Sequence, residues 1–340
     1  MMLTERRHSL LRLLVDEYVA TAQPVGSAAI VEKYQLSVSP ATVRNEMVSL
    51  EEEGYIVQPH TSAGRIPTDS GYRFYVESLM QEETLPQPDE QTIRHQFHQV
   101  ARGLEDWARL AAAILAARLH NAAVVTAPYS PRPRLRWLEL VSVHDLQALV
   151  VVVLQEARVL QRSLALEQPF SQDDLTVIAR RLNAQFAGKT AAGMREGAQD
   201  FSLAVEAPVV KAAADLLEAA DASEFELAFM EGLRELLRQP EFAQGERILH
   251  LLELLEERNL AQAIPVGALP AHDIRIIIGA EHPTDVMRQC SIVTSRYSGP
   301  SGLRGTISVV GPTRMHYPRA VPLVRYMDSL MEELLGDYFA

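Results

Sequence analysis

Apolar residues in the first 80 positions recur every three or four residues, the spacing of helices that bury one face. The pattern predicts three helices, over about 4–20, 28–34 and 40–53, the second capped by Ser27. Two helices joined by a short turn form the common device for laying a helix in the major groove of DNA. The pattern therefore predicts a helix-turn-helix, although a plain helical hairpin has the same spacing.

The third predicted helix has clear start and stop signals. Ser39 can cap it through its side chain, and Pro40 suits the first helical position because its missing N–H costs nothing there. Gly54 can end the helix in the left-handed region. The spacing places three apolar residues on the inner face: Val43, Met47 and Leu50.

The outer face of this helix has the chemistry of a DNA-reading surface. It carries Thr42, Arg44, Asn45 and Ser49. Arginine and asparagine suit the edges of guanine and adenine, respectively. Serine and threonine near the helix start can reach a phosphate together with free backbone N–H groups. Taken singly, Arg44 and Asn45 also fit solvated surface residues.

A hairpin follows the third helix. Residues 55–58 predict a strand, 59–65 a polar turn, and Ile66 the start of the return strand. This hairpin has the form of a wing with Arg65 near its tip, where an arginine suits a phosphate or a narrow minor groove. A further helix, rich in aromatic residues that pack the domain, is expected from Thr68 onward.

The rest of the chain alternates between strand and helix patterns. A polar linker near 81–88 leads to a helical connector over about 90–120. Three β-like runs follow, and the middle one, nearly all Val and Leu, is expected to be buried on both faces. The three runs are 135–144, 146–156 and 158–166.

Helical spacing then dominates residues 170–262, with one β-like run over 224–230. Strands return after this segment, and a last helix closes the chain. Strands, then helices, then strands again predict one α+β domain with a helical insertion. The predicted helices are 173–186, 208–220, 246–260 and 318–338, and the returning strands are 274–279, 290–297 and 305–311.

Composition limits the classes of protein that fit. The 340 residues carry 32 Lys and Arg against 44 Asp and Glu, a net charge of -12, so a uniformly basic nucleic-acid coat is excluded. A lone cysteine, Cys290, excludes a disulfide framework and a cysteine metal cluster, and it fits a reducing cytosol. With no long apolar run and no signal peptide, we expect a soluble cytoplasmic protein.

Four stretches carry a resemblance to a known family: 39–47, 60–76, 291–294, and 310–315 with 322–324. In them the chain resembles the HrcA family, the heat-inducible transcription repressors of bacteria. The stretches lie at opposite ends of the sequence, so the resemblance covers essentially the whole chain. It implies a multidomain α+β protein with an N-terminal winged helix-turn-helix and a GAF-like α+β domain that holds an inserted helical dimerisation segment.

The resemblance also implies boundaries and contacts. The winged helix would span 1–82, the linker and connecting helix 83–120, the GAF-like domain 121–169 and 263–340, and the inserted segment 170–262. DNA contacts are expected from the third helix and the wing. The residues concerned are Ser39, Pro40, Thr42, Arg44, Asn45, His60, Thr61, Ser62, Gly64 and Arg65.

The function implied by the resemblance is repression of chaperone operons. Family members bind the inverted-repeat operator CIRCE as homodimers, a GroEL-type chaperonin keeps them active, and heat stress releases repression when misfolded proteins occupy the chaperonin. The family is not one of enzymes, and we expect neither a cofactor nor a metal site.

Four arginines leave one alternative open. They lie beside glycine-containing loops, which on a GAF-like sheet can bind a small anion. This reading describes a ligand-sensing GAF-type regulator or an anion-binding enzyme. The same side chains also fit a salt-bridge surface between domains. They are Arg296, Arg304, Arg314 and Arg319.

Overall fold

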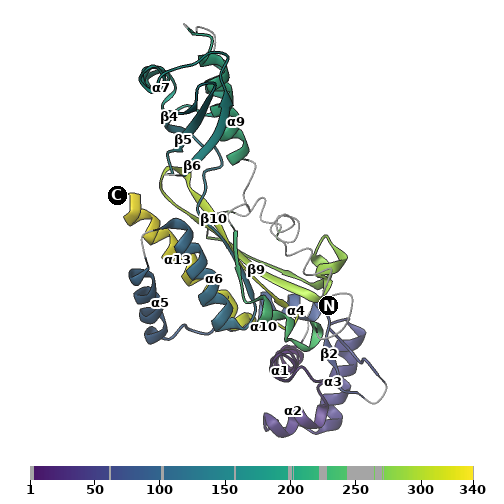
Figure 1. The fold of residues 1–340 in the computed structure, drawn as a ribbon. Coiled ribbons are helices and arrows are strands. Elements are labelled where there is room, and N and C mark those ends of the chain that lie inside the picture. The colour runs from purple at the N-terminus through teal and green to yellow at the C-terminus, as the bar shows by residue number, and fades with distance from the viewer. Residues whose placement is uncertain are drawn as a thin grey trace. The chain divides into compact units, whose positions relative to one another are not determined.

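The computed structural model divides the chain into two compact units (Figure 1). The first contains Met1–Ala127, Ala228–Ser298 and Gly305–Ala340, and the second contains Pro128–Leu227 and Gly299–Arg304. The residues that the structure describes are 4–60, 63–100, 103–156, 158–197, 201, 203–221, 228–242, 264, 270 and 272–339. In that part of the chain, no helix combines the length and the apolar character needed to span a membrane.

The first unit begins with a winged helix. Its helices are α1 (Glu5–Thr21), α2 (Ser27–Lys33) and α3 (Pro40–Glu52), followed by α4 (Asp69–Phe74) and the short π-helix η1 (Tyr75–Leu79). The wing strands β1 (Ile56–Val57) and β2 (Ile66–Pro67) pair antiparallel. The predicted helix-turn-helix and hairpin are confirmed. The expected cap of α2 is wrong: Ser27 is its first helical residue and Gly26 is the cap, with no side-chain bond.

A five-stranded sheet forms the rest of the first unit, in the order β7-β3-β10-β9-β8. Helices α5 (Gln87–Gln99), α6 (Leu104–Leu119) and α13 (Tyr317–Phe339) accompany it; α6 packs on β3 and β7, and α13 packs on β9 and α6 (Figure 1). The strands are β3 (Ala122–Thr126), β7 (Ala228–Glu231), β8 (Ile274–Ile278), β9 (Cys290–Ser298) and β10 (Arg304–Pro312), whose first residue belongs to the second unit.

Short helical turns connect these strands. They are α10 (Leu233–Leu237) and the 3-10 turns η2 (Pro240–Phe242), η3 (Gly279–Glu281), η4 (Asp285–Gln289) and η5 (Pro300–Gly302). The sequence pattern did not predict β3, and it treated α5 and α6 as one connector. The predicted helix over 246–260 lies outside the described residues.

The second unit is built on a three-stranded antiparallel meander, β4 (Leu135–His144), β5 (Gln147–Leu154) and β6 (Val159–Ala165). Helices α7 (Gln172–Phe186), α8 (Ala191–Glu196) and α9 (Glu206–Asp221) share one hydrophobic core with it. The capping box of Ser171 and Asp174 starts α7.

This core corrects the expected domain boundary. We expected β4, β5 and β6 to belong to the GAF-like domain and the inserted segment to begin at 170. Instead, these strands bury one face against α7 and α9, so the second unit begins at Pro128. Burial alternates along β5, with Val150 and Val152 fully buried and their neighbours half-buried. The expectation that both faces are buried is therefore wrong within this chain.

Candidate nucleic-acid interface

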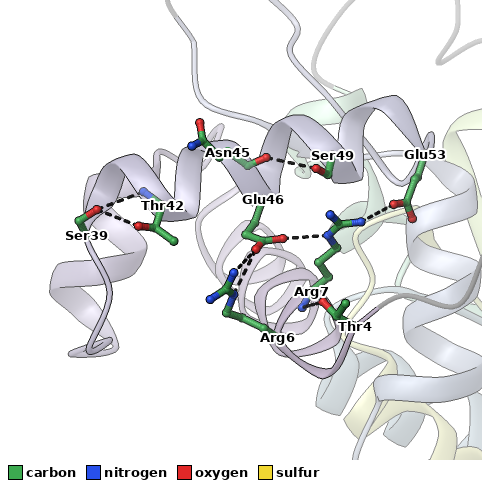
Figure 2. Close-up of polar contacts among 9 residues, drawn as sticks. All are labelled: Thr4, Arg6, Arg7, Ser39, Thr42, Asn45, Glu46, Ser49 and Glu53. Atoms are coloured by element: carbon green, nitrogen blue, oxygen red, sulfur yellow. Dashed lines mark hydrogen bonds and ion pairs between the residues drawn. The ribbon is translucent and has the colours of Figure 1, made fainter.

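The start of α3 is built as the sequence predicts. The Ser39 hydroxyl accepts a hydrogen bond from the backbone N–H of Thr42 at 3.2 Å, and Pro40 takes the first helical position (Figure 2). Pro40 has no N–H and the N–H of Val43 donates to the Ser39 carbonyl at 3.1 Å, so what this end of α3 offers an anion such as a phosphate is chiefly the positive end of the helix dipole. Both Ser39 and Pro40 are exposed.

Packing on one side of α3 determines what the other side presents. Val43, Met47 and Leu50 are buried in the core of the winged helix. Arg44 and Asn45 are consequently exposed, and the Asn45 side chain projects away from α1 in Figure 2. Thr42 and Ser49, also expected on the outer face, are half-buried. The predicted inner and outer faces are confirmed.

Two carboxylates, Glu46 in α3 and Glu53 at its C-cap, are neutralised from α1. Arg7 Nε donates to Glu46 at 2.8 Å and Arg7 Nη1 to Glu53 at 2.6 Å, while Arg6 also binds Glu46 (Figure 2). Hydrogen bonds from Arg7 and Arg6 hold the pKa of Glu46 below its ordinary value. Because of this pairing, these two carboxylates do not present uncompensated charge beside the outer face. Among the described residues, Arg44 forms no ion pair.

The wing differs from expectation at Arg65. This residue lies where the wing turn enters β2, its backbone pairs with Val25, and its guanidinium binds Glu51 at 2.9 Å with only 12% of the side chain exposed. It is therefore not near the tip. Gly64 lies so close to the backbone of Val25 that any side chain would collide with it. His60 is exposed, whereas Thr61 and Ser62 lie outside the described residues.

The four arginines of the alternative site already have different roles. Arg314 is half-buried and binds Gln239 and Glu241, and Arg304 lies over the ring of Tyr129 at 5.3 Å. Arg296 is buried, and Arg319 is exposed. Arg304 belongs to the second unit and the other three to the first. The ion pair of Arg314, the ring contact of Arg304 and the division of the four arginines between the two units do not favour a single anion site.

Comparison with known proteins decides the family. The profile described as "HrcA protein C terminal domain" matches residues 105–321. The "Heat-inducible transcription repressor HrcA" of Roseiflexus castenholzii is 41% identical, over 99% of this chain and 96% of the relative. The chain belongs to the HrcA family. The repressor of the same name from Chloroflexus aurantiacus is 42% identical over 99% of this HrcA chain and 95% of its own length.

A solved structure supports the architecture of HrcA. It is titled "Crystal structure of a hypothetical protein at 2.2 A resolution", has a TM-score of 0.65 at 23% identity, and covers 99% of each chain. At this identity the likeness concerns the fold alone. The family is one of transcription repressors, not of enzymes.

Sequence reasoning missed three residues of this interface. Arg6 and Arg7 bind a carboxylate some 40 positions away, which no local pattern indicates. Val48 is 39% exposed one turn after Arg44, on a helix whose other valine is buried. An apolar side chain on a groove-facing surface suits the methyl group of thymine, so the helical spacing could have identified Val48.

Proposed function

We propose that this HrcA chain represses heat-inducible chaperone operons by inserting α3 into the major groove of an inverted-repeat operator of the CIRCE type. Arg44 and Asn45 read base edges. Ser39, Pro40 and Thr42 hold a phosphate at the helix start. The wing turn, with His60, Thr61 and Ser62, lies along the adjacent backbone, and Gly64 and Arg65 shape its base. Such a repressor acts in the bacterial cytoplasm.

One observation carries this proposal. The capped start of α3 presents exposed Arg44 and Asn45, while Glu46 of the same helix and Glu53 at its C-cap bind Arg6 and Arg7. A helix with these acids unpaired would repel the phosphate backbone. Pairing them on the α1 side leaves an outer face whose chemistry is that of a groove-reading helix.

An inverted repeat requires a symmetric pair of chains, and we infer that the open face of the β4-β5-β6 sheet joins them. On this face Trp137, Val153 and Val159 align across the three strands, and Leu149 and Val151 continue the patch along β5. Trp137 is 46% exposed and Val159 59% exposed. A second copy would bury the aliphatic surface that this chain leaves half-covered.

The dimer surface is tested by Val159→Arg, which places a charge in the proposed contact. We expect dissociation at concentrations where the wild type is a dimer, measured by analytical ultracentrifugation. Val177→Arg is the matched control, because Val177 is 63% exposed on α7, which packs on the opposite face of the sheet. A Val159→Arg protein that stays dimeric would remove this surface from the account.

DNA binding is tested with an inverted-repeat duplex from upstream of the chaperone genes or of this chain's own gene. The wild type should bind it far more tightly than a scrambled duplex, with affinity that falls steeply as salt rises. Arg44→Ala and Asn45→Ala should each cost about 1–3 kcal/mol. Arg94→Ala, which removes an ion pair with Glu333 on α13, serves as the control. Unchanged affinity in both α3 variants would exclude groove reading by α3.

Release on heating is the second part of the proposal. Warming is expected to expose apolar surface such as the open sheet face, to cause aggregation, and to make renewed binding depend on a GroEL-type chaperonin. Light scattering during a temperature ramp, with and without chaperonin and ATP, measures this. A clear, reversible transition that is independent of chaperonin would contradict it.

A further inference from the structure

The winged helix is joined covalently to the rest of the first unit only through the segment after η1. A single covalent connection does not by itself set the orientation of a domain, so contacts between the two parts must set it. Two groups of contacts also join the winged helix to the rest of the first unit. They come from the parts of the family-resembling stretches that have no role in the interface described above: Asp69 and Arg73 within 60–76, and Arg314 within 310–315.

The first contact lies at α4. The carboxylate of Asp69 accepts a hydrogen bond from the backbone N–H of Ala280 at 2.8 Å. Gly279, the residue before it, has a φ of +52°, and a β-carbon on it would overlap the Asp69 carboxylate. Glycine is required there both by the left-handed backbone and by the close approach of α4.

Arg73, one turn further along α4, makes the second contact. Its Nε donates to Glu281 at 2.7 Å and its Nη2 to the backbone carbonyl of Ile276, also at 2.7 Å. A hydrogen bond to Glu281 raises the pKa of Arg73, and Arg73 in turn lowers the pKa of Glu281 although burial opposes this shift. The pair is charged at neutral pH and holds α4 against the end of β8.

The third contact comes from the other end of the chain. Arg314 donates to the carbonyl of Val19 near the end of α1, and on its other side to Gln239 at 2.6 Å and to Glu241. Between these two sets of polar contacts, the buried rings of Tyr72 and Tyr317 lie 6.3 Å apart. The winged helix is thus held against the rest of the first unit at both α1 and α4. Two separate attachment points fix its orientation as well as its position.

We propose that Asp69, Arg73 and Arg314, here called the junction, are positioning residues for operator recognition. They do not touch DNA. They fix the winged helix on the sheet so that the two α3 helices of a dimer meet half-sites at one defined separation. This inference rests on the proposed function, because it presumes that α3 reads DNA.

The physical consequence is specific. One winged helix binds one half-site with an affinity that does not depend on the junction. Binding of the second half-site is intramolecular, and its strength depends on how well the geometry is fixed in advance. Loosening the junction therefore weakens the complete operator and widens the range of half-site spacings that the dimer accepts.

The test measures the affinity of three duplexes for the dimer: a single half-site, the complete inverted repeat, and repeats with longer or shorter spacers. For Arg73→Ala we expect an unchanged half-site affinity, about a tenfold loss on the complete repeat, and a weaker preference for one spacer. The double variant Arg73→Glu with Glu281→Arg restores the ion pair and should recover the spacer preference. Arg94→Ala should match the wild type.

The outcomes separate the possibilities. Wild-type affinity and spacer preference in Arg73→Ala would overturn the role of the junction. An equal loss on the half-site and the complete repeat would show that Arg73 only maintains the folded domain, and would also overturn it. A wild type that prefers neither duplex over a scrambled one would reject the proposed function itself, and with it this inference.

Discussion

Removal of the cap at the start of α3 tests whether this helix end faces DNA. Ser39→Ala deletes the acceptor for the Thr42 N–H and leaves one more unsatisfied donor in the first turn. Losses of such caps cost about 1 kcal/mol. Because 1.4 kcal/mol corresponds to a factor of ten, fraying of the first turn should increase about fivefold.

A matched variant exists at the start of α1. Thr4 caps α1 through the N–H of Arg7 at 3.4 Å, so Thr4→Ala removes the same kind of bond from a helix that does not enter the groove. Ser39→Asn keeps a capping side chain and should retain wild-type behaviour. Each helix end is thus perturbed alike, and only one of them is proposed to meet a phosphate.

Two measurements are needed. Hydrogen exchange of peptides covering the first turn of α3 reports fraying, which fluorescence cannot, since the only tryptophans, Trp107 and Trp137, lie outside the winged helix. Anisotropy of a labelled duplex gives affinity. We expect up to a fivefold loss of operator affinity for Ser39→Ala and none for Thr4→Ala. Equal losses in the two variants would refute the placement of the α3 start at DNA.

Three further predictions concern other parts of the first unit. Arg65→Ala should destabilise the wing by about 1 kcal/mol and leave the salt dependence of DNA binding unchanged, because the guanidinium already binds Glu51; a salt slope reduced by about one would show a phosphate contact instead. Hydrogen bonds, first from Arg7, lower the folded-state pKa of Glu46. The loss in free energy of unfolding caused by Glu46→Gln, measured in denaturant titrations, should therefore be full at neutral pH and vanish as the pH falls through that lowered pKa. A loss that persists in acid would argue against the ion pairs. Burial raises the pKa of Cys290 to about 12, so iodoacetamide should label it only on the temperature ramp that ends DNA binding, and rapid labelling of the cold protein would contradict its burial.

Local rules predicted the winged helix well because its signals are short in range. The cap at Ser39, the proline after it and the end at Gly54, whose φ is +83°, all act within a few residues of their position. The inner face of α3 likewise follows from helical spacing alone.

The sequence was less informative where contacts between residues far apart in the chain determine the structure. The valine-rich run of β5 predicts burial but cannot tell which helices cover it, and so the second unit was divided at the wrong place. Five small and β-branched residues between a helix and a proline-rich loop gave no strand signal for β3. The sequence predicted Arg65 near the wing tip, suited to a phosphate or a narrow minor groove, because nothing local pairs it with Glu51.

The junction was out of reach for the same reason. Asp69 and Arg73 meet residues more than 200 positions away, and their motif reads locally as a helix start with a solvated arginine. The resemblance marked these stretches as characteristic of the family without indicating what they contact. The structure assigns them a place through the close approach of Gly279 to Asp69 and the bonds of Arg73 to Glu281 and Ile276.

The most direct test of the central claim is a base-resolved comparison of wild type and Asn45→Ala. Each position of the inverted repeat is replaced symmetrically, and the affinity of both proteins is measured. The wild type should lose about 1–3 kcal/mol at each position that it reads, and Asn45→Ala should lose its discrimination at a single A·T position in each half while keeping the others. An identical pattern for the two proteins, with Arg44→Ala also unchanged, would contradict the reading of DNA by α3.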